Sequence, residues 1–163
     1  GDAQTSYQSG IQASFDQYGL SGAADYYTTN TSKPKEYKDP EAITAGQNDV
    51  LTGNANLSTI TIPWDNAASV EKKLERILTQ KWIAVYPDGQ EAWSEFRRTG
   101  YPKLFPVIIN NSNGAVAPGD FIRRSTFPSN EYATNNAAVL KAITTLSVPK
   151  DLSGTRLWWD VAH

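Results

Sequence analysis

Hydrophobic residues near the start of the chain recur at the spacing of an α-helix. Tyr7, Ile11, Phe15 and Tyr18 follow one another at intervals of four, four and three residues, which places them on one helical face. Asp2 stands where an N-cap is expected. Gly19 stands where a left-handed residue ends a helix without steric cost. The pattern predicts an amphipathic helix between these two residues.

A second and stronger helical pattern covers about residues 66–86. Its apolar positions are Val70, Leu74, Ile77, Leu78, Trp82 and Val85. The charged positions between them, Glu71, Lys72, Lys73, Glu75 and Arg76, are expected on the solvent side. Asp65 or Asn66 is the expected N-cap.

The segment Tyr86-Pro87-Asp88-Gly89 interrupts this helix and starts another. Asp88, with Glu91 three residues later, has the form of a capping box. The second helix is expected over about residues 89–99, ending at Gly100. Because two helices joined by so short a turn must lie antiparallel, the sequence predicts a helical hairpin of about residues 66–86 and 89–99.

The remaining segments are less regular. Residues 21–57 are rich in Thr, Asn, Gly, Pro and Lys and predict a long irregular region with at most one helical turn at residues 41–46. Residues 58–63 read as a short strand or an extended lead-in. A β-hairpin is expected around Asn113-Gly114, and a helix capped by Ser129 is expected to break at Asn135-Asn136. The predicted fold class is therefore mainly α, with long loops and one or two short β-hairpins, in a single domain of residues 1–163.

Composition removes several classes of chemistry. The 163-residue chain has no cysteine, one histidine (His163, the last residue) and a net charge of −2. Thiol catalysis and cysteine-based metal sites are excluded, and a terminal histidine lacks the surrounding shell that a catalytic or metal-binding histidine needs. The mixed charges do not form the basic patch that nucleic acid would require. We expect no cofactor, no metal ion and no nucleic-acid partner.

Two acidic residues suggest one class of enzyme as an alternative function. Glu91 and Glu95 lie one helical turn apart, so a carboxylate-based glycoside hydrolase is a candidate. That reaction needs two carboxyl groups facing each other across a sugar ring, whereas neighbours on one helix face point the same way. Capping and ion pairing explain these residues better. The Arg97-Arg98 and Arg123-Arg124 pairs are likewise expected to form structural ion pairs with carboxylates such as Glu95 or Glu131.

Aromatic residues outside the helical patterns are the best candidates for binding a ligand. Trp64, Tyr37 and Tyr27 occur in irregular sequence, where no apolar stripe accounts for them. An aromatic ring in a loop can stack against the apolar face of a sugar. We therefore interpret these three residues as a candidate saccharide-binding set.

Several motifs together resemble one protein family. They are YQSGIQASFDQYG, LERILTQKWIAVYPDGQEAWSEFRRTGYPKL, RRSTFPSNEYATN and RLWWDV. Their order and spacing are similar to the C-terminal region of SusD/RagB proteins, the nutrient-binding outer-membrane lipoproteins of Bacteroidetes. The motifs cover the chain except for roughly residues 23–63.

The resemblance implies a binding protein rather than an enzyme. Members of this family capture glycans or other oligomeric nutrients on the outside of the outer membrane and pass them to a SusC-type TonB-dependent transporter. It also implies tetratricopeptide-like helix pairs and an N-terminal lipid anchor, which lies outside a C-terminal fragment such as this one. Two alternatives remain open: the carboxylate-based hydrolase, and a helical protein-docking scaffold that binds no small ligand.

Overall fold

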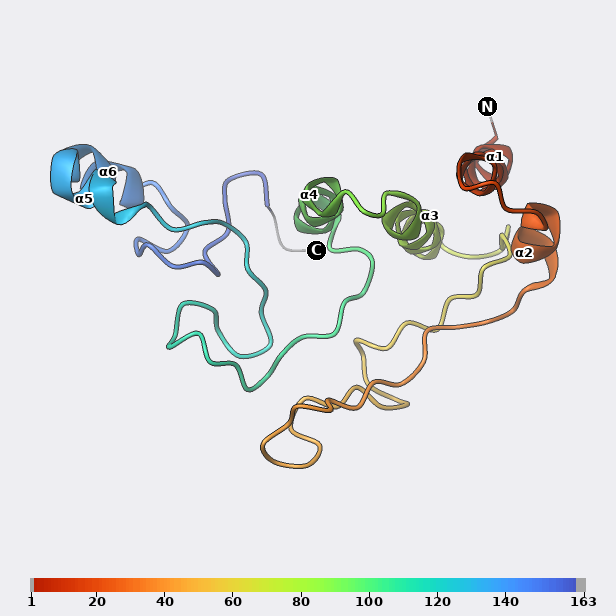
Figure 1. The fold of residues 1–163 in the computed structure, drawn as a ribbon, viewed down its shortest axis with the longest axis horizontal. Coiled ribbons are helices and arrows are strands. Elements are labelled where there is room, and N and C mark those ends of the chain that lie inside the picture. The colour runs from red at the N-terminus through yellow and green to blue at the C-terminus, as the bar shows by residue number, and fades with distance from the viewer. Residues whose placement is uncertain (1, 161–163) are drawn as a thin grey trace. The chain divides into compact units, whose positions relative to one another are not determined.

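The computed structural model describes residues 2–160 and is mainly helical. Within these residues the helices are α1 (Ala3–Gln17), α2 (Ala23–Thr29), α3 (Val70–Ala84), α4 (Gly89–Thr99), α5 (Ser129–Thr134) and α6 (Asn136–Ile143) (Figure 1). The predicted fold class is confirmed. None of the described helices is long and apolar enough to cross a membrane. His163 lies outside the described residues.

The chain divides into two compact units. The first comprises Gly1–Glu36, Val50–Phe96 and Gly100–Leu104, and the second comprises Tyr37–Asp49, Arg97–Thr99 and Phe105–His163. The first unit therefore holds α1, α2, α3 and most of α4, and the second holds α5 and α6. The long irregular region contributes to both units.

Helix α1 forms as its sequence pattern predicts. The Asp2 carboxylate accepts a hydrogen bond from the Thr5 backbone N–H at 3.2 Å and caps the helix. Tyr7 and Ile11 are buried on the apolar face. Gly19 adopts a φ of 64° just after the helix, the left-handed conformation that only glycine adopts at little cost. Helix α1 packs on both α2 and α3.

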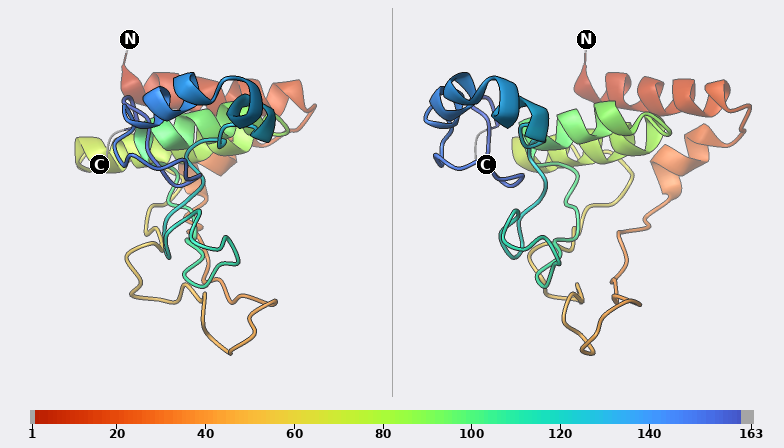
Figure 2. Two further views of the ribbon diagram at one scale, coloured as in Figure 1. Left: turned by 90° about the vertical axis from the view of Figure 1, so that its left-hand side faces the viewer. Right: turned by 60° about the vertical axis from the view of Figure 1, so that its left-hand side comes forward.

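The helical hairpin is present, with a later start than predicted. Ser69, not Asp65 or Asn66, caps α3, and its side chain accepts from the Lys72 backbone N–H at 3.3 Å. Asp88 caps α4 as expected, accepting from the Glu91 N–H at 3.1 Å. Figures 1 and 2 show α3 and α4 side by side. The tetratricopeptide-like character of the pair stays a prediction.

The prediction of which α3 residues face solvent was wrong at three positions. Glu75 and Arg76 are buried, with exposed fractions of 1% and 4%, whereas Val70 is 79% exposed. The charged pair is buried because polar partners from the preceding segment reach it. The Ser58 hydroxyl donates to the Glu75 carboxylate, and Arg76 Nε donates to the Thr61 carbonyl at 2.9 Å. Helical periodicity reports a residue's face but not the polar groups that the rest of the chain places there.

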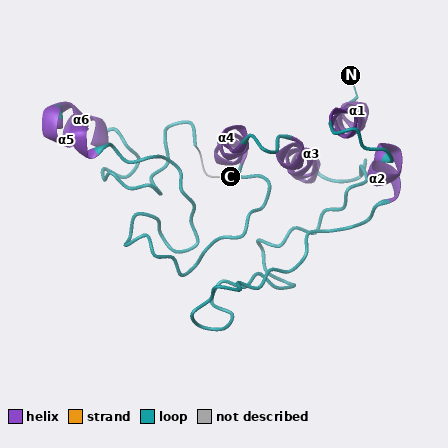
Figure 3. Ribbon diagram, in the orientation of Figure 1, coloured by secondary structure: helices purple, strands orange, loops and turns teal. Residues whose placement is uncertain are grey.

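The predicted β-hairpins were also wrong, because the described residues contain no strand (Figure 3). The turn at Asn113-Gly114 does form, with φ angles of 52° and 85°. The flanking backbone bonds with side chains instead of a partner strand. Ser112 N–H donates to Asn110 Oδ1 at 3.1 Å, and the Ser112 hydroxyl both accepts from Val116 N–H and donates to its carbonyl, each at 3.0 Å. Such local bonds compete with a β-ladder.

The other irregular segments follow the predictions in part. Residues 23–29 form α2, which the sequence did not predict, and residues 41–46 form turns without a helix. The predicted break between the last two helices lies at Asn135, which has a φ of −138°. Helix α5 begins at Ser129, but its N-cap residue is Pro128, with no side-chain cap.

Candidate ligand-binding surfaces

Trp64 is integrated into the first unit. Its ring packs on the Tyr7 ring with the centroids 5.4 Å apart, and Lys73 Nζ lies 6.0 Å from its centroid. The indole N–H donates to Asn66 Oδ1 at 3.0 Å. Tyr7 in turn donates to the Ile62 carbonyl at 2.6 Å. Burial raises the pKa of the Tyr7 hydroxyl above its usual value, and the opposite effect of nearby Arg76 is smaller. These contacts fix the orientation of Trp64 and leave it half-buried.

Tyr27 closes one side of a shallow groove on α1. The groove has a volume of about 350 Å³ and is lined along α1 by Gln8, Ser9, Gln12 and Asp16, among others. These α1 residues share one helical face, opposite the apolar stripe of the helix. The volume is at the lower end of the range found for ligand pockets, roughly 300–1,000 Å³. Of the three predicted binding residues, Tyr27 is the one that lines this groove.

Tyr37 belongs to the second unit and lies on another ring. It is 37% exposed, and its ring stacks on Phe105 with a centroid distance of 5.5 Å and an interplanar angle of 24°. Burial and the nearby Asp39 carboxylate both raise the pKa of the Tyr37 hydroxyl. Phe105 covers one face of the ring and holds it in a fixed orientation, while the rest of Tyr37 is exposed.

A loop that is held by several hydrogen bonds, residues 39–49, follows Tyr37. Asn48 is buried at the base of this loop and joins the loop to a distant segment. Asn48 Nδ2 donates to Asp39 Oδ2 at 2.7 Å, and Asn48 Oδ1 accepts from the Ile109 N–H at 2.9 Å. The bond from Asn48, followed by one from the Glu41 N–H, lowers the pKa of Asp39. At the tip, Ile43 is 88% exposed. The loop therefore holds a fixed conformation through its base.

The structure places the three predicted aromatic residues in two different units: Trp64 and Tyr27 lie in the first and Tyr37 in the second. Within the first unit, Trp64 and Tyr27 contact different neighbours. The sequence reading overlooked two features. The polar face of α1 carried a signal, since its Gln, Ser and Asp residues recur at helical spacing. The second feature is Trp158, an aromatic residue that is 90% exposed.

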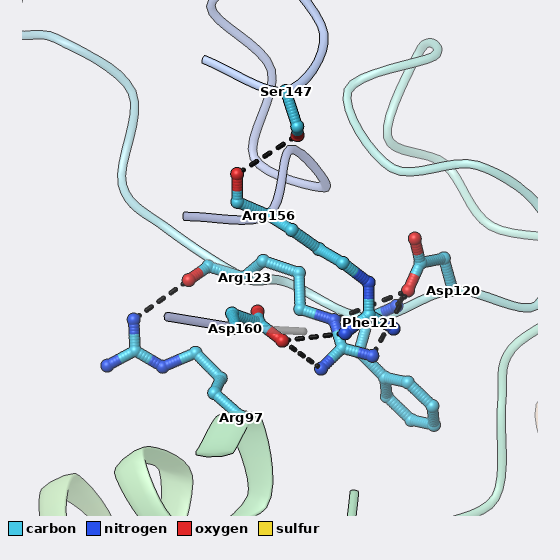
Figure 4. A network of polar contacts seen from close by, with 7 residues as sticks. All are labelled: Arg97, Asp120, Phe121, Arg123, Ser147, Arg156 and Asp160. Carbon is cyan, nitrogen blue, oxygen red and sulfur yellow. Dashed lines mark hydrogen bonds and ion pairs between the residues drawn. The ribbon is translucent and has the colours of Figure 1, made fainter. Parts of the chain in front are cut away.

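Three of the four paired arginines, Arg97, Arg123 and Arg124, are buried and make structural contacts. Asp160 is 2% exposed and lies 2.6 Å from Arg156 Nη1 and 3.4 Å from Arg123 Nη1 (Figure 4). Arg97 Nη1 donates to the Arg123 carbonyl at 2.8 Å, and the Arg97 guanidinium lies 4.8 Å from the Trp159 ring centroid. Arg123 and Arg124 thus form ion pairs with Asp160 and Asp151 of the tail, whereas glutamates near them in sequence were the expected partners.

The acidic pair of α4 is bound to a single cation. Lys81 Nζ of α3 lies 2.8 Å from Glu91 Oε1 and 3.4 Å from Glu95 Oε1. The hydrogen bond to Glu91 raises the pKa of Lys81. Both carboxylates approach the same ammonium group from one side, which differs from the facing arrangement that glycoside hydrolysis requires. Among the described residues, no group of three or more His, Asp or Glu side chains could hold a metal ion.

Comparison with known proteins assigns the family. The sequence profile of the SusD-like family, "Susd and RagB outer membrane lipoprotein", matches residues 1–160. The chain belongs to the SusD/RagB family. A search of curated proteins finds no significant match.

Solved structures of SusD homologues match the whole chain. A chitin-binding SusD homologue from Flavobacterium johnsoniae is 46% identical, with a TM-score of 0.80 over 100% of this chain and 32% of the homologue. A SusD-like protein from Bacteroides thetaiotaomicron is 44% identical, with a TM-score of 0.82 over 100% of this chain and 33% of that protein. A homologue from Bacteroides uniformis is 41% identical, with a TM-score of 0.84 over 99% and 32%. This SusD-like chain therefore spans about a third of the length of these structures.

Proposed function

We propose that the protein carrying this chain binds glycans without altering them and delivers them for import through a SusC-type TonB-dependent transporter. It would act at the extracellular face of the outer membrane, held by an N-terminal lipid anchor. The observation that carries this proposal is the 46% identity, over the full chain, to a homologue described as chitin-binding. The family description as an outer-membrane lipoprotein supports the location.

Within this proposal, Trp64, Tyr37 and Tyr27 each supply a ring for stacking against a sugar. An aromatic ring binds a sugar through the apolar face of the pyranose, which requires part of the ring to be accessible and its orientation to be fixed. Tyr37 meets both conditions through its stacking on Phe105. Trp64 is fixed by Tyr7 and Asn66. Chitin-type oligosaccharides are the first ligands to test, because the similar Flavobacterium protein is a chitin binder.

The hydrolase alternative is less well supported. Glu91 and Glu95 lie one turn apart on α4 and pair with the same Lys81 Nζ, whereas glycoside hydrolysis needs two carboxyl groups that face each other across the sugar. The docking-scaffold alternative predicts no saccharide binding at all, and a titration separates it from the proposal.

The test is calorimetric titration of the whole purified protein with chitohexaose, followed by chromatography of the sugar after prolonged incubation. We expect saturable binding and recovery of intact hexamer. Shorter products would identify an enzyme. No heat of binding with chitohexaose or with a panel of other oligosaccharides, together with tight association with the transporter, would establish the docking scaffold instead.

A further inference from the structure

The polar groove on α1 has the chemistry of a saccharide site. It is lined by Gln8, Ser9, Gln12 and Asp16 of α1, among others, and by Tyr27 of α2. The α1 residues follow the spacing of one helical face, so their polar ends are directed to the same side. We call this feature the α1 groove.

Most hydrogen-bonding groups of the α1 groove are unused. Gln12 Nε2 donates to Asp16 Oδ1 at 2.8 Å. Within residues 2–160, no other hydrogen bond involves the side chains of Gln8, Ser9, Gln12, Asp16 or Tyr27. The groove therefore offers amide, hydroxyl and carboxylate groups that can both donate and accept. Sugar hydroxyls, which also donate and accept, are matched to such a set.

Tyr27 supplies the apolar component that a sugar also needs. It is half-buried, and its neighbours in the groove are mainly polar side chains of α1. A tyrosine ring with polar surroundings can stack against the C–H face of a pyranose while its hydroxyl takes part in hydrogen bonding. Stacking and hydrogen bonding are thus both available in one groove.

The charge of the groove selects among glycans. Asp16 is its one ionisable carboxylate, and no lysine or arginine lines it. An anionic glycan, such as a uronate or a sulfated polymer, would meet a like charge without a compensating cation. A neutral saccharide meets no such penalty.

The opposite side of α1 is chemically different. There a cleft of about 330 Å³ is lined by Tyr7, Ile11, Phe15, Ile77 and Ile83, among others. Its surface is mainly apolar and offers few partners for sugar hydroxyls. The two sides of α1 therefore differ in the hydrogen-bonding groups that they offer to a ligand.

We propose that the α1 groove is a subsite for a neutral oligosaccharide, in which a pyranose ring stacks on Tyr27 and its hydroxyl groups bond with Gln8, Gln12 and Asp16. This inference rests on the proposed function and extends it by assigning residues and by excluding anionic glycans. It gives Tyr27 a defined set of polar partners that the sequence reading did not include.

The test uses the double variant Gln8→Ala/Gln12→Ala of the whole protein. Alanine is the strongest helix former, so α1 is expected to remain folded while two hydrogen-bonding side chains are lost. We expect the affinity for chitohexaose, measured by calorimetry, to fall by about tenfold or more. Tyr27→Phe should retain stacking and lose less than Tyr27→Leu. Gln17→Ala, on the same helix but outside the groove, is the matched control and should bind like the wild type.

The outcomes separate this inference from the proposed function. Wild-type binding of chitohexaose that is unchanged in the double variant and in Tyr27→Leu would overturn the groove assignment and leave the proposed function standing. Binding of a galacturonic acid hexamer as tight as that of chitohexaose, and equally lowered by the double variant, would overturn the selection for neutral sugars. A wild-type protein that binds no oligosaccharide would overturn both proposals.

Discussion

Arg124 and Asp151, 27 residues apart in sequence, form an ion pair whose side chains are only 8% and 10% exposed. The second oxygen of Asp151 accepts from the Tyr132 hydroxyl at 2.8 Å and from the Phe127 N–H at 3.0 Å. One carboxylate thus joins Arg124 to the start of the α5 region and to α5 itself. The second unit has few buried hydrophobic residues, so we infer that this polar junction is a main source of its order.

Asp151→Ala is expected to destabilise the protein by about 3 kcal/mol, because it leaves Arg124 nearly buried without its partner carboxylate. Chemical denaturation followed by circular dichroism measures the effect. Glu41→Ala is the control, since Glu41 is exposed and a surface change of this kind costs within about 0.5 kcal/mol. Equal stability of the two variants would mean that the junction contributes nothing.

The same carboxylate predicts how stability depends on pH. Burial would raise the pKa of Asp151, but the bonds from Arg124, Tyr132 and the Phe127 N–H outweigh it and hold the pKa below its usual range. A carboxyl whose pKa is lower in the folded state contributes stability above its unfolded pKa, near 3.9. That contribution is lost as the pH falls through the folded pKa. The melting temperature of wild type should therefore decline more steeply below about pH 4 than that of Asp151→Asn.

The sequence was sufficient to predict the helix ends that depend on nearby residues. Asp2 caps α1, Asp88 caps α4 and Gly100, with a φ of 72°, ends α4, all as the residue types predict. These features depend on neighbours within a few positions. The family motifs added the expectation of a binding protein, and the family itself is confirmed by the match over residues 1–160.

The features that the sequence could not predict depend on contacts between residues far apart in the chain. Glu75 is buried because Ser58 reaches it from 17 residues away, and Asn48 is buried because it bonds with Ile109, 61 residues away. The candidate site shows the same limit. Tyr27 could be selected as an aromatic outside the helical patterns, but the α1 groove exists only because α2, which lacks a clear helical pattern, packs on α1.

The double variant Glu91→Gln/Glu95→Gln tests the hydrolase alternative. Because Lys81 pairs with the exposed Glu91 and the partly buried Glu95, we expect a loss of stability of about 1–2 kcal/mol. Glycan affinity should be unchanged, and neither wild type nor variant should release shorter sugars. Hydrolysis by wild type that the variant abolishes would contradict the proposed binding role.

Ser58 and Glu75 should behave as a coupled pair. Glu75 is 1% exposed, its Oε1 accepts from the Ser58 hydroxyl, and its Oε2 lies 2.7 Å from Lys72 Nζ. Ser58→Ala removes a bond to a buried charge and should cost about 1.5–3 kcal/mol. Glu75→Gln places an amide against the Lys72 ammonium and should cost a similar amount. Because both changes act on one bond, the double variant should be less destabilised than the sum, with a coupling energy of about 0.5–3 kcal/mol in a denaturation cycle. Strict additivity would mean that Lys72, and not Ser58, is the partner that stabilises the buried carboxylate.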